Sequence, residues 1–181
     1  MNYIVQTKNW INDFVVHLNL CPFAQFPFEN DRIRYVIYEG RNLEDFMEIL
    51  RQELLLVQKT PAKEIETTLL IHPFILLDFL DYNDFLDVAN HLIFALQLEG
   101  LIQIASFHPA YQFEGTHKEN VTNYTNRSPY PMLHLLREES IEKAIEQYGS
   151  THQIPTNNME TLQEMGLQQT KKLLNDSKRK D

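Results

Sequence analysis

The sequence has few of the residues on which several common kinds of site depend. It holds one cysteine, Cys21, so no disulfide can form within the chain. Only 5 of its 181 residues are glycine, and neither GxGxxG nor GxxxxGK[ST] occurs, so the two standard nucleotide-binding loops are absent. No apolar run approaches the roughly 18 residues of a membrane span, and the N-terminal residues lack the pattern of a signal peptide. We expect a cytoplasmic protein with no membrane partner.

Basic residues are also few. The chain has 16 Lys and Arg against 25 Asp and Glu, a net charge of −9. Such a field repels polyanions, so we expect no nucleic-acid partner. The absence of any internal shift in composition predicts a single α/β domain over residues 1–175. Residues 176–181 are expected to be a frayed basic tail. The oligomeric state does not follow from the sequence.

Helical and strand-like patterns alternate along the chain. Strands are predicted over 32–38, 66–72 and 101–107, and helices over 3–19, 43–58, 82–98, 133–148 and 159–174. Asn42 is the expected N-cap of the second helix. Such alternation is typical of βαβ units. The predicted fold is therefore α/β, with a small, largely parallel three-stranded sheet, about five flanking helices and a long ordered loop before the fourth helix.

Two predicted strands end in a His-Pro pair. One ends at His72-Pro73 and the other at His108-Pro109. If the strands are parallel, both histidines lie at the carboxyl edge of the sheet, where open α/β sheets bind ligands. Alternatively, each histidine simply ends a strand and bonds to a backbone carbonyl.

The segment from His108 to Met132 is the strongest functional signal in the sequence. A connection of this length without secondary structure is uncommon in a compact domain and is usually functional when it is ordered. Its aromatic residues set it apart from a disordered linker. We expect it to be ordered and to fold over the carboxyl edge of the sheet.

The end of this segment suggests an anion site. Ser128 is predicted to cap the fourth helix, with Pro129 at the first helical position. Free backbone N–H groups there, beside Asn126 and Arg127, would bind a phosphate or carboxylate. The alternative is that Arg127 braces the loop by bonding to its carbonyls.

Further candidates follow on the predicted fourth helix, where His134, Arg137 and Glu138 would share one face. A third histidine near the others raises the question of a metal site, but the spacings match no compact set of ligands, so no metal is expected. No cofactor is indicated. The apolar neighbours of Cys21 predict a buried, unreactive thiol with a raised pKa.

Four segments resemble a known family. They read LCPFA at 20–24, ETTLL at 66–70, SFHPxYQF at 106–113 and NRSPYPxxHLLRE at 126–138. These motifs resemble those of an uncharacterised, mainly bacterial family that is classed as a domain of unknown function. The resemblance implies a cytoplasmic single-domain protein and brings no activity, cofactor or substrate with it.

Two functions remain open. The first is an enzyme acting on a small anionic substrate such as a phosphate or carboxylate ester. Its acid–base residues would be His108 and His134, oriented by Glu138, Glu66 or Glu114; its ligand-binding residues would be His72, Asn126, Arg127, Ser128 and Arg137.

The second is a non-catalytic module that binds a metabolite or a protein, in which these polar residues brace the loop over 108–134. Convergence of His108, His134 and Arg127 on an open pocket would favour the enzyme. Burial of each against backbone carbonyls would favour the module.

Overall fold

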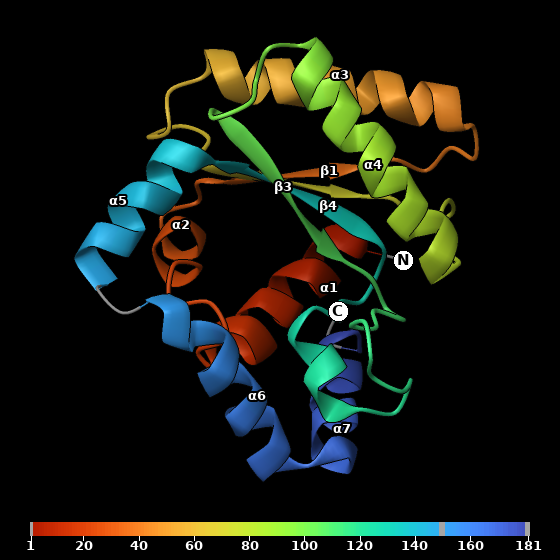
Figure 1. Cartoon of the computed structure of the whole chain (residues 1–181), viewed down its shortest axis with the longest axis vertical. Helices are drawn as coiled ribbons and strands as arrows, with labels where there is room; N and C mark the ends of the chain where they lie inside the picture. The colour runs from red at the N-terminus through yellow and green to blue at the C-terminus, as the bar shows by residue number, and fades with distance from the viewer. Residues whose placement is uncertain (1, 149–150, 180–181) are drawn as a thin grey trace.

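A four-stranded sheet lies between two layers of helices in the computed structural model, which describes residues 2–148 and 151–179 (Figure 1). The strands are β1 (Ile33–Ile37), β2 (Thr67–Ile71), β3 (Ile102–Phe107) and β4 (Met132–Arg137). Their order is β1-β2-β4-β3. β1 and β2 are parallel, and β4 is antiparallel to both of its neighbours, so β3 runs in the same direction as β1 and β2.

The fourth strand corrects the predicted fold. Residues 132–137 were expected to lie almost wholly in a helix over 133–148, but they form β4, and the helix α5 (Glu138–Tyr148) begins only afterwards. The sheet is therefore mixed and four-stranded rather than largely parallel and three-stranded. The error has a physical reason. β4 is covered on both faces, so its residues form an apolar run without alternation, and periodicity alone cannot distinguish such a run from a buried helix.

Two helices cover one face of the sheet. They are α3 (Leu43–Lys59) and α4 (Phe79–Ala95). The predicted cap of α3 is confirmed, because Asn42 Oδ1 accepts the N–H of Asp45 at 3.0 Å. α4 begins earlier than predicted, because Asp78 caps it by accepting the N–H of Leu80 at 2.8 Å. The core on this side consists chiefly of Phe46, Leu50, Leu54, Leu70, Leu133 and Leu135.

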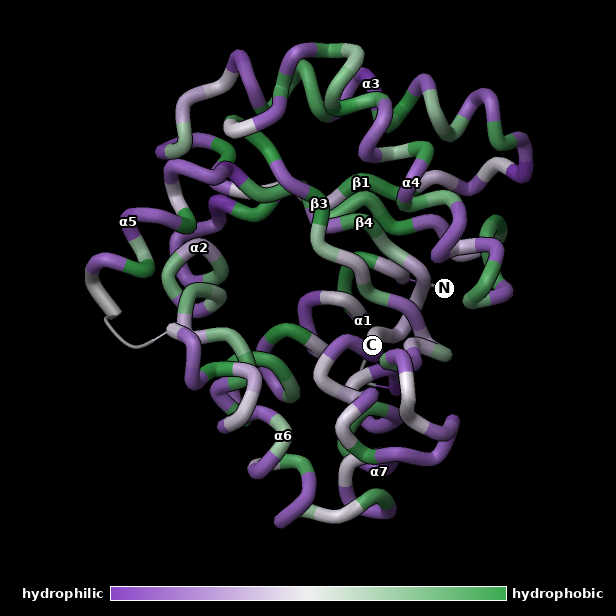
Figure 2. The backbone as a smooth tube through the Cα atoms, viewed as in Figure 1, coloured by the Kyte–Doolittle hydropathy of each residue, from purple (hydrophilic) through white to green (hydrophobic). Residues whose placement is uncertain are grey.

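The other face of the sheet is covered by segments from both ends of the chain. These are α1 (Tyr3–Trp10), the π-helix η1 (Ile11–Val16), α2 (Gln25–Glu29), α6 (Ile154–Met165) and α7 (Leu167–Ser177), with the short 3₁₀ helix η3 (Thr151–Gln153) before α6. The single helix predicted over 159–174 is two helices, because Gly166 adopts φ +78° and breaks it. The strands and the helix faces toward them are largely apolar (Figure 2).

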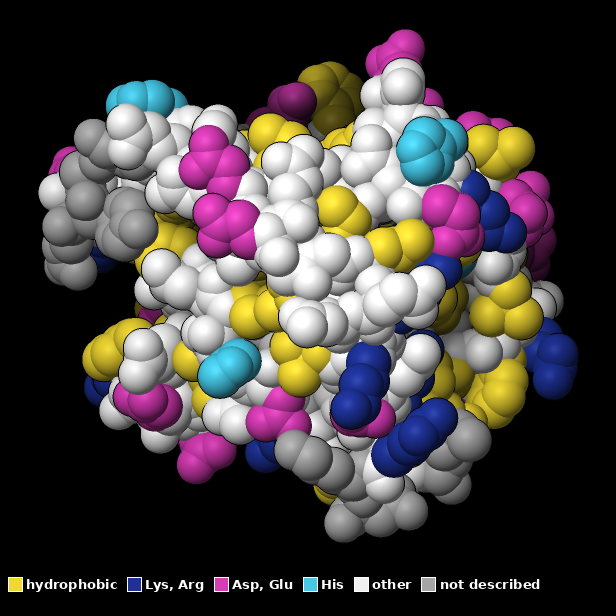
Figure 3. Space-filling view, turned by 90° about the horizontal axis from the view of Figure 1, so that it is seen from below, with side chains coloured by type: hydrophobic (Ala, Val, Ile, Leu, Met, Phe, Trp, Pro, Cys, Tyr) yellow, Lys and Arg dark blue, Asp and Glu magenta, His cyan; other side chains and the backbone are white. Residues whose placement is uncertain are grey.

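The end of the chain is more ordered than a frayed tail would be up to Arg179. α7 continues to Ser177, which is buried, and burial lowers the pKa of Lys178. Lys and Arg side chains gather in one part of the surface seen from the side of α6 and α7 (Figure 3). Residues 180–181 of the predicted tail lie outside the described residues. No helix of the described residues is long and apolar enough to cross a membrane.

Tyr82 links three elements through its hydroxyl group. It donates to the carbonyl of Met132 at 2.8 Å and accepts the N–H of Phe107 at 3.1 Å, so α4 is tied to β4 and β3 at once. We predict that Tyr82→Phe lowers the free energy of unfolding by about 1–3 kcal/mol, because two buried backbone groups lose their partner. Tyr38→Phe is the control, since its hydroxyl bonds to Asn42 at an exposed position where water can replace it. Urea unfolding of both variants tests this, and equal losses would contradict it.

Candidate functional site

The two His-Pro pairs lie at the same edge of the sheet, as the sequence predicted. β2 and β3 point the same way, so His72 and His108 both follow strand ends at what we call the carboxyl edge. Tyr82 lies between them, with its ring centre 5.8 Å from that of His72 and 5.0 Å from that of His108. The three rings form one buried aromatic group.

His108 has no ring nitrogen left for acid–base chemistry. Its Nδ1 accepts the N–H of Ala110 at 3.0 Å, and its Nε2 lies 3.2 Å from the carbonyl oxygen of Leu76. Nε2 must then carry the proton, and the ring is neutral. Burial lowers the pKa of His108, opposed by its bond to Leu76. This geometry matches the alternative in which the histidine ends its strand bonded to a backbone carbonyl.

His72 is fully buried. Its Nδ1 donates to the carbonyl of Ile75 at 3.0 Å, and its Nε2 makes no hydrogen bond with any described residue. Burial lowers the pKa of His72 to about 4. The ring is therefore neutral near pH 7 and is separated from solvent, so it cannot contact a ligand at the surface.

Arg127 braces the long segment. Its Nε donates to the carbonyl of Tyr111 at 3.1 Å, and its Nη2 donates to that of Lys118 at 2.7 Å. The guanidinium also stacks on Tyr124, 4.3 Å from the ring centre. Only 6% of Arg127 is exposed. The guanidinium of Arg127 thus bonds to the backbone of the segment to which it belongs.

The side chains on either side of Arg127 also donate hydrogen bonds to backbone carbonyls. Asn126 donates from Nδ2 to the carbonyl of Ser106 at 3.2 Å, and Ser128 donates from Oγ to that of Tyr130 at 2.7 Å. No helix begins at Ser128, so the prediction of a helix N-terminus there is wrong, and the backbone N–H groups on which the predicted anion site rested are not those of a helix start. The segment instead contains the 3₁₀ helix η2 (Val121–Thr125), which packs against α6 and α7.

Asn123 is a further brace at the centre of the segment. Its Oδ1 accepts the N–H of Phe113 at 3.0 Å and the hydroxyl of Thr116 at 2.8 Å, and its Nδ2 donates to the carbonyl of His117 at 3.0 Å. A side chain expected to face a ligand thus satisfies the loop's own backbone.

His134, Arg137 and Glu138 do not share a face. On a strand, His134 and Arg137 point to opposite sides of the sheet, and Glu138 begins α5. His134 faces the α1 side near Phe107, and its Nε2 is buried without a hydrogen-bond partner among the described residues. Burial lowers the pKa of His134 to about 4. The helix face predicted to carry His134, Arg137 and Glu138 together is therefore wrong.

Two other expectations concern a metal and the thiol. Nowhere in 2–148 or 151–179 do three or more His, Cys, Asp or Glu side chains lie together as a metal would require. Cys21 packs against the core on the α1 side. Burial raises the pKa of its thiol, opposed by backbone hydrogen bonds from Phe23 and Ala24, as its apolar neighbours predicted.

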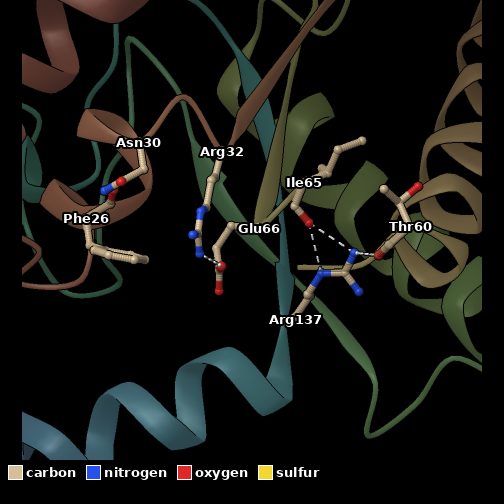
Figure 4. Close-up of polar contacts among 7 residues, drawn as sticks. All are labelled: Phe26, Asn30, Arg32, Thr60, Ile65, Glu66 and Arg137. Atoms are coloured by element: carbon tan, nitrogen blue, oxygen red, sulfur yellow. Dashed lines mark hydrogen bonds and ion pairs between the residues drawn. The ribbon is translucent and has the colours of Figure 1, made fainter. Parts of the chain in front are cut away.

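A second polar cluster lies at the opposite edge of the sheet, where β1 and β2 begin and β4 ends. We call this the amino edge (Figure 4). Arg32 and Glu66 precede β1 and β2, and Arg137 is the last residue of β4. Glu66 lies between the two arginines, with its Oε2 3.9 Å from Arg32 Nη1. The side chains of Arg32 and Glu66 are 29% and 20% exposed.

Arg137 is held in place by the turn before β2. Its Nε donates to the carbonyl of Ile65 at 3.1 Å, and its Nη2 donates to the carbonyls of Ile65 and Thr60. Burial lowers the pKa of Arg137, and the charge of Glu66 opposes that shift. Within the described chain its Nη1 has no hydrogen-bond partner.

Arg32 is the functional candidate that the sequence did not reveal. It lies in a strand-like run that predicts only secondary structure, and its partners are brought to it by the fold. Its guanidinium stacks on Phe26, 4.8 Å from the ring centre, and donates no hydrogen bond to any residue that the structure describes. Arg32, Glu66 and Arg137 together carry a net charge of +1 in a protein of net charge −9.

The bracing role of Arg127 gives a direct prediction. Arg127→Ala should lower the free energy of unfolding by about 2–4 kcal/mol, because buried carbonyls lose charged donors. Arg51→Ala is the matched control, since Arg51 lies on the surface and pairs with Glu48 alone, and it should change stability by under about 1 kcal/mol. Denaturant unfolding of both variants measures this; a stable Arg127→Ala protein would refute the brace.

The buried imidazole of His72 should make stability depend on pH. Its pKa is about 4 in the folded protein and about 6.5 when unfolded. Its contribution is therefore fully present above pH 6.5 and is lost as the pH falls toward 4, up to about 3 kcal/mol. We predict that His72→Asn makes the loss of stability between pH 7 and pH 4.5 smaller, while His91→Asn, at an exposed site, leaves it unchanged. Unfolding curves measured across this pH range test the prediction. If the free energy of unfolding of His72→Asn falls with pH as steeply as that of the wild type, the prediction is wrong.

Comparison with known proteins gives a match to a family model. No curated protein and no solved structure matches it. A family model described as Protein of unknown function (DUF1415) matches residues 2–172, a range that includes the strands, the segment over 108–131 and both edges of the sheet. The chain belongs to this family of proteins of unknown function.

Proposed function

We propose that the protein is a non-catalytic module that binds a small oxyanion, a phosphate or a carboxylate, at the amino edge of its sheet. The observation that carries the proposal is the state of Arg32. Its side chain is 29% exposed, and its guanidinium pairs with Glu66 but makes no hydrogen bond with the described residues.

Partial removal of a guanidinium from water carries a free-energy cost. A charged group that loses water needs hydrogen bonds in return. Glu66 does not supply them, because 3.9 Å is too long for a hydrogen bond. The planar fork of an arginine matches the geometry of carboxylates and phosphates. An oxyanion beside Arg32 would accept from its free N–H groups.

Glu66 gives the cluster a way to discriminate among anions. Its carboxylate lies between the two guanidinium groups and makes no hydrogen bond among the described residues. A ligand with a hydroxyl or ammonium group next to its anionic group would donate to Glu66. A ligand that is anionic throughout would be repelled by it. The cluster therefore fits a singly charged oxyanion with a neighbouring donor better than a polyanion.

The geometry at the carboxyl edge favours a non-catalytic module over an enzyme that uses acid–base catalysis. His108 and Arg127 bond to backbone carbonyls, and His72 and His134 are neutral and buried. In this proposal the segment over 108–131 is a rigid part of the scaffold.

Calorimetric titration of phosphate and of acetate into the protein at low ionic strength tests the proposal. We expect saturable binding of at least one anion, weakened about 10-fold or more in Arg32→Gln, because a charge-assisted bidentate contact is lost. Arg41→Gln is the control, since it removes the same charge from an exposed arginine that stacks on Phe74.

Two results would overturn the proposal. One is no binding of either anion by the wild-type protein. The other is equal weakening in the Arg32→Gln and Arg41→Gln variants, which would show a response to net charge rather than to this cluster.

A further inference from the structure

The outer face of α4 exposes large apolar side chains. Leu80 is 70% exposed, Val88 48% and Phe94 64%. At 100° per residue these three positions fall on one side of the helix, opposite the buried residues Phe85 and Ala89. Leu77 and Leu101, exposed by 59% and 51%, lie just before and just after α4. Single exposed apolar residues are ordinary, but here three of them recur along one side of the same helix, separated by polar residues.

The same face is acidic. Asp84 and Asp87 lie among the exposed apolar residues, and Asp81 flanks them. The stretch 64–117 holds eight Asp and Glu residues and no Lys or Arg. Nearly the whole net charge of −9 thus comes from the segment that includes α4. We call the surface formed by Leu80, Asp84, Asp87, Val88, His91 and Phe94 the α4 outer face.

The surface near the end of α4 has two shallow, open hollows. Asn90, His91, Phe94 and Glu99 line one open hollow near the end of α4. Ala95 and Gln97 join Phe94 and Glu99 around an adjoining one. Phe94 and Glu99 therefore line both hollows.

We propose that the α4 outer face binds a basic amphipathic helix of a partner protein. Apolar side chains on one face of that helix would cover Leu80, Val88 and Phe94, and its Lys or Arg side chains would pair with Asp84 and Asp87. This site is separate from the oxyanion cluster, and neither proposal depends on the other.

The negative charge of the α4 outer face favours this partner over other occupants. A second copy of the chain, packed symmetrically, would place Asp84 and Asp87 against the same acidic residues. An anionic membrane surface would be repelled in the same way. A basic helix alone matches both the apolar row and the charge that flanks it.

Fluorescence anisotropy with a labelled synthetic helix tests the proposal. The probe carries Leu at i, i+3, i+4 and i+7 spacing and Lys at the remaining positions. We expect saturable binding that weakens with added salt, and weakens about 10-fold or more in Phe94→Ser and in the double variant Asp84→Asn, Asp87→Asn. Met159→Ser is the control, because Met159 is an apolar residue 38% exposed on α6, on the other side of the sheet, and this variant should bind the probe as the wild type does.

A second peptide with Glu in place of every Lys should not bind. Binding of both peptides alike, no binding of either, or equal weakening by Met159→Ser and Phe94→Ser would overturn the proposal. Analytical sedimentation of the protein without peptide tests whether a second copy of the chain occupies this surface instead. A dimer that Phe94→Ser converts to a monomer would assign the α4 outer face to a second copy.

Discussion

The insertion of β4 between β2 and β3 is the constraint on which the rest of the structure depends. β4 hydrogen-bonds to both neighbours along its length, so its two ends are fixed at opposite edges of the sheet. At one end the carbonyl of Pro131 accepts the N–H of His72 at 3.0 Å, which anchors the long segment at the carboxyl edge. At the other end Arg137 is placed beside Glu66. One strand thus separates residues that the sequence had grouped into a single site.

The two edges differ in how their polar groups are satisfied. At the carboxyl edge, Arg127, Asn123 and Asn126 bond almost entirely to backbone carbonyls and N–H groups of the segment they belong to or of β3. A loop without regular structure has many such groups, and burying them requires side chains of this kind. At the amino edge, the side chains of Arg32 and Glu66 are partly buried and form an ion pair, but neither makes a hydrogen bond with the described residues. Polar groups that have satisfied each other stabilise a scaffold, whereas those that have not are available to a ligand.

Local patterns predicted the parts of the fold that depend on local chemistry. The three strands β1, β2 and β3 and the cap at Asn42 follow from β-branched runs and a side-chain acceptor. β4 could not be found this way, because burial on both faces removes the alternation that identifies a strand. The common edge of His72 and His108 was predicted from strand direction, but whether their nitrogens were free depended on Ile75, Leu76 and Ala110, which the sequence does not show to be neighbours. Arg32 was missed because its environment is assembled from distant residues.

The central claim is that the ends of β4 have different roles, a braced scaffold at the carboxyl edge and an oxyanion site at the amino edge. A titration of isotope-labelled protein with phosphate and with acetate, followed through backbone amide and arginine Nε–H resonances, tests it most directly. The account predicts saturable shifts at Arg32, Glu66 and Arg137, with His108 and residues 126–128 unchanged. Saturable shifts at His108 and Arg127, with Arg32 unmoved, would contradict it.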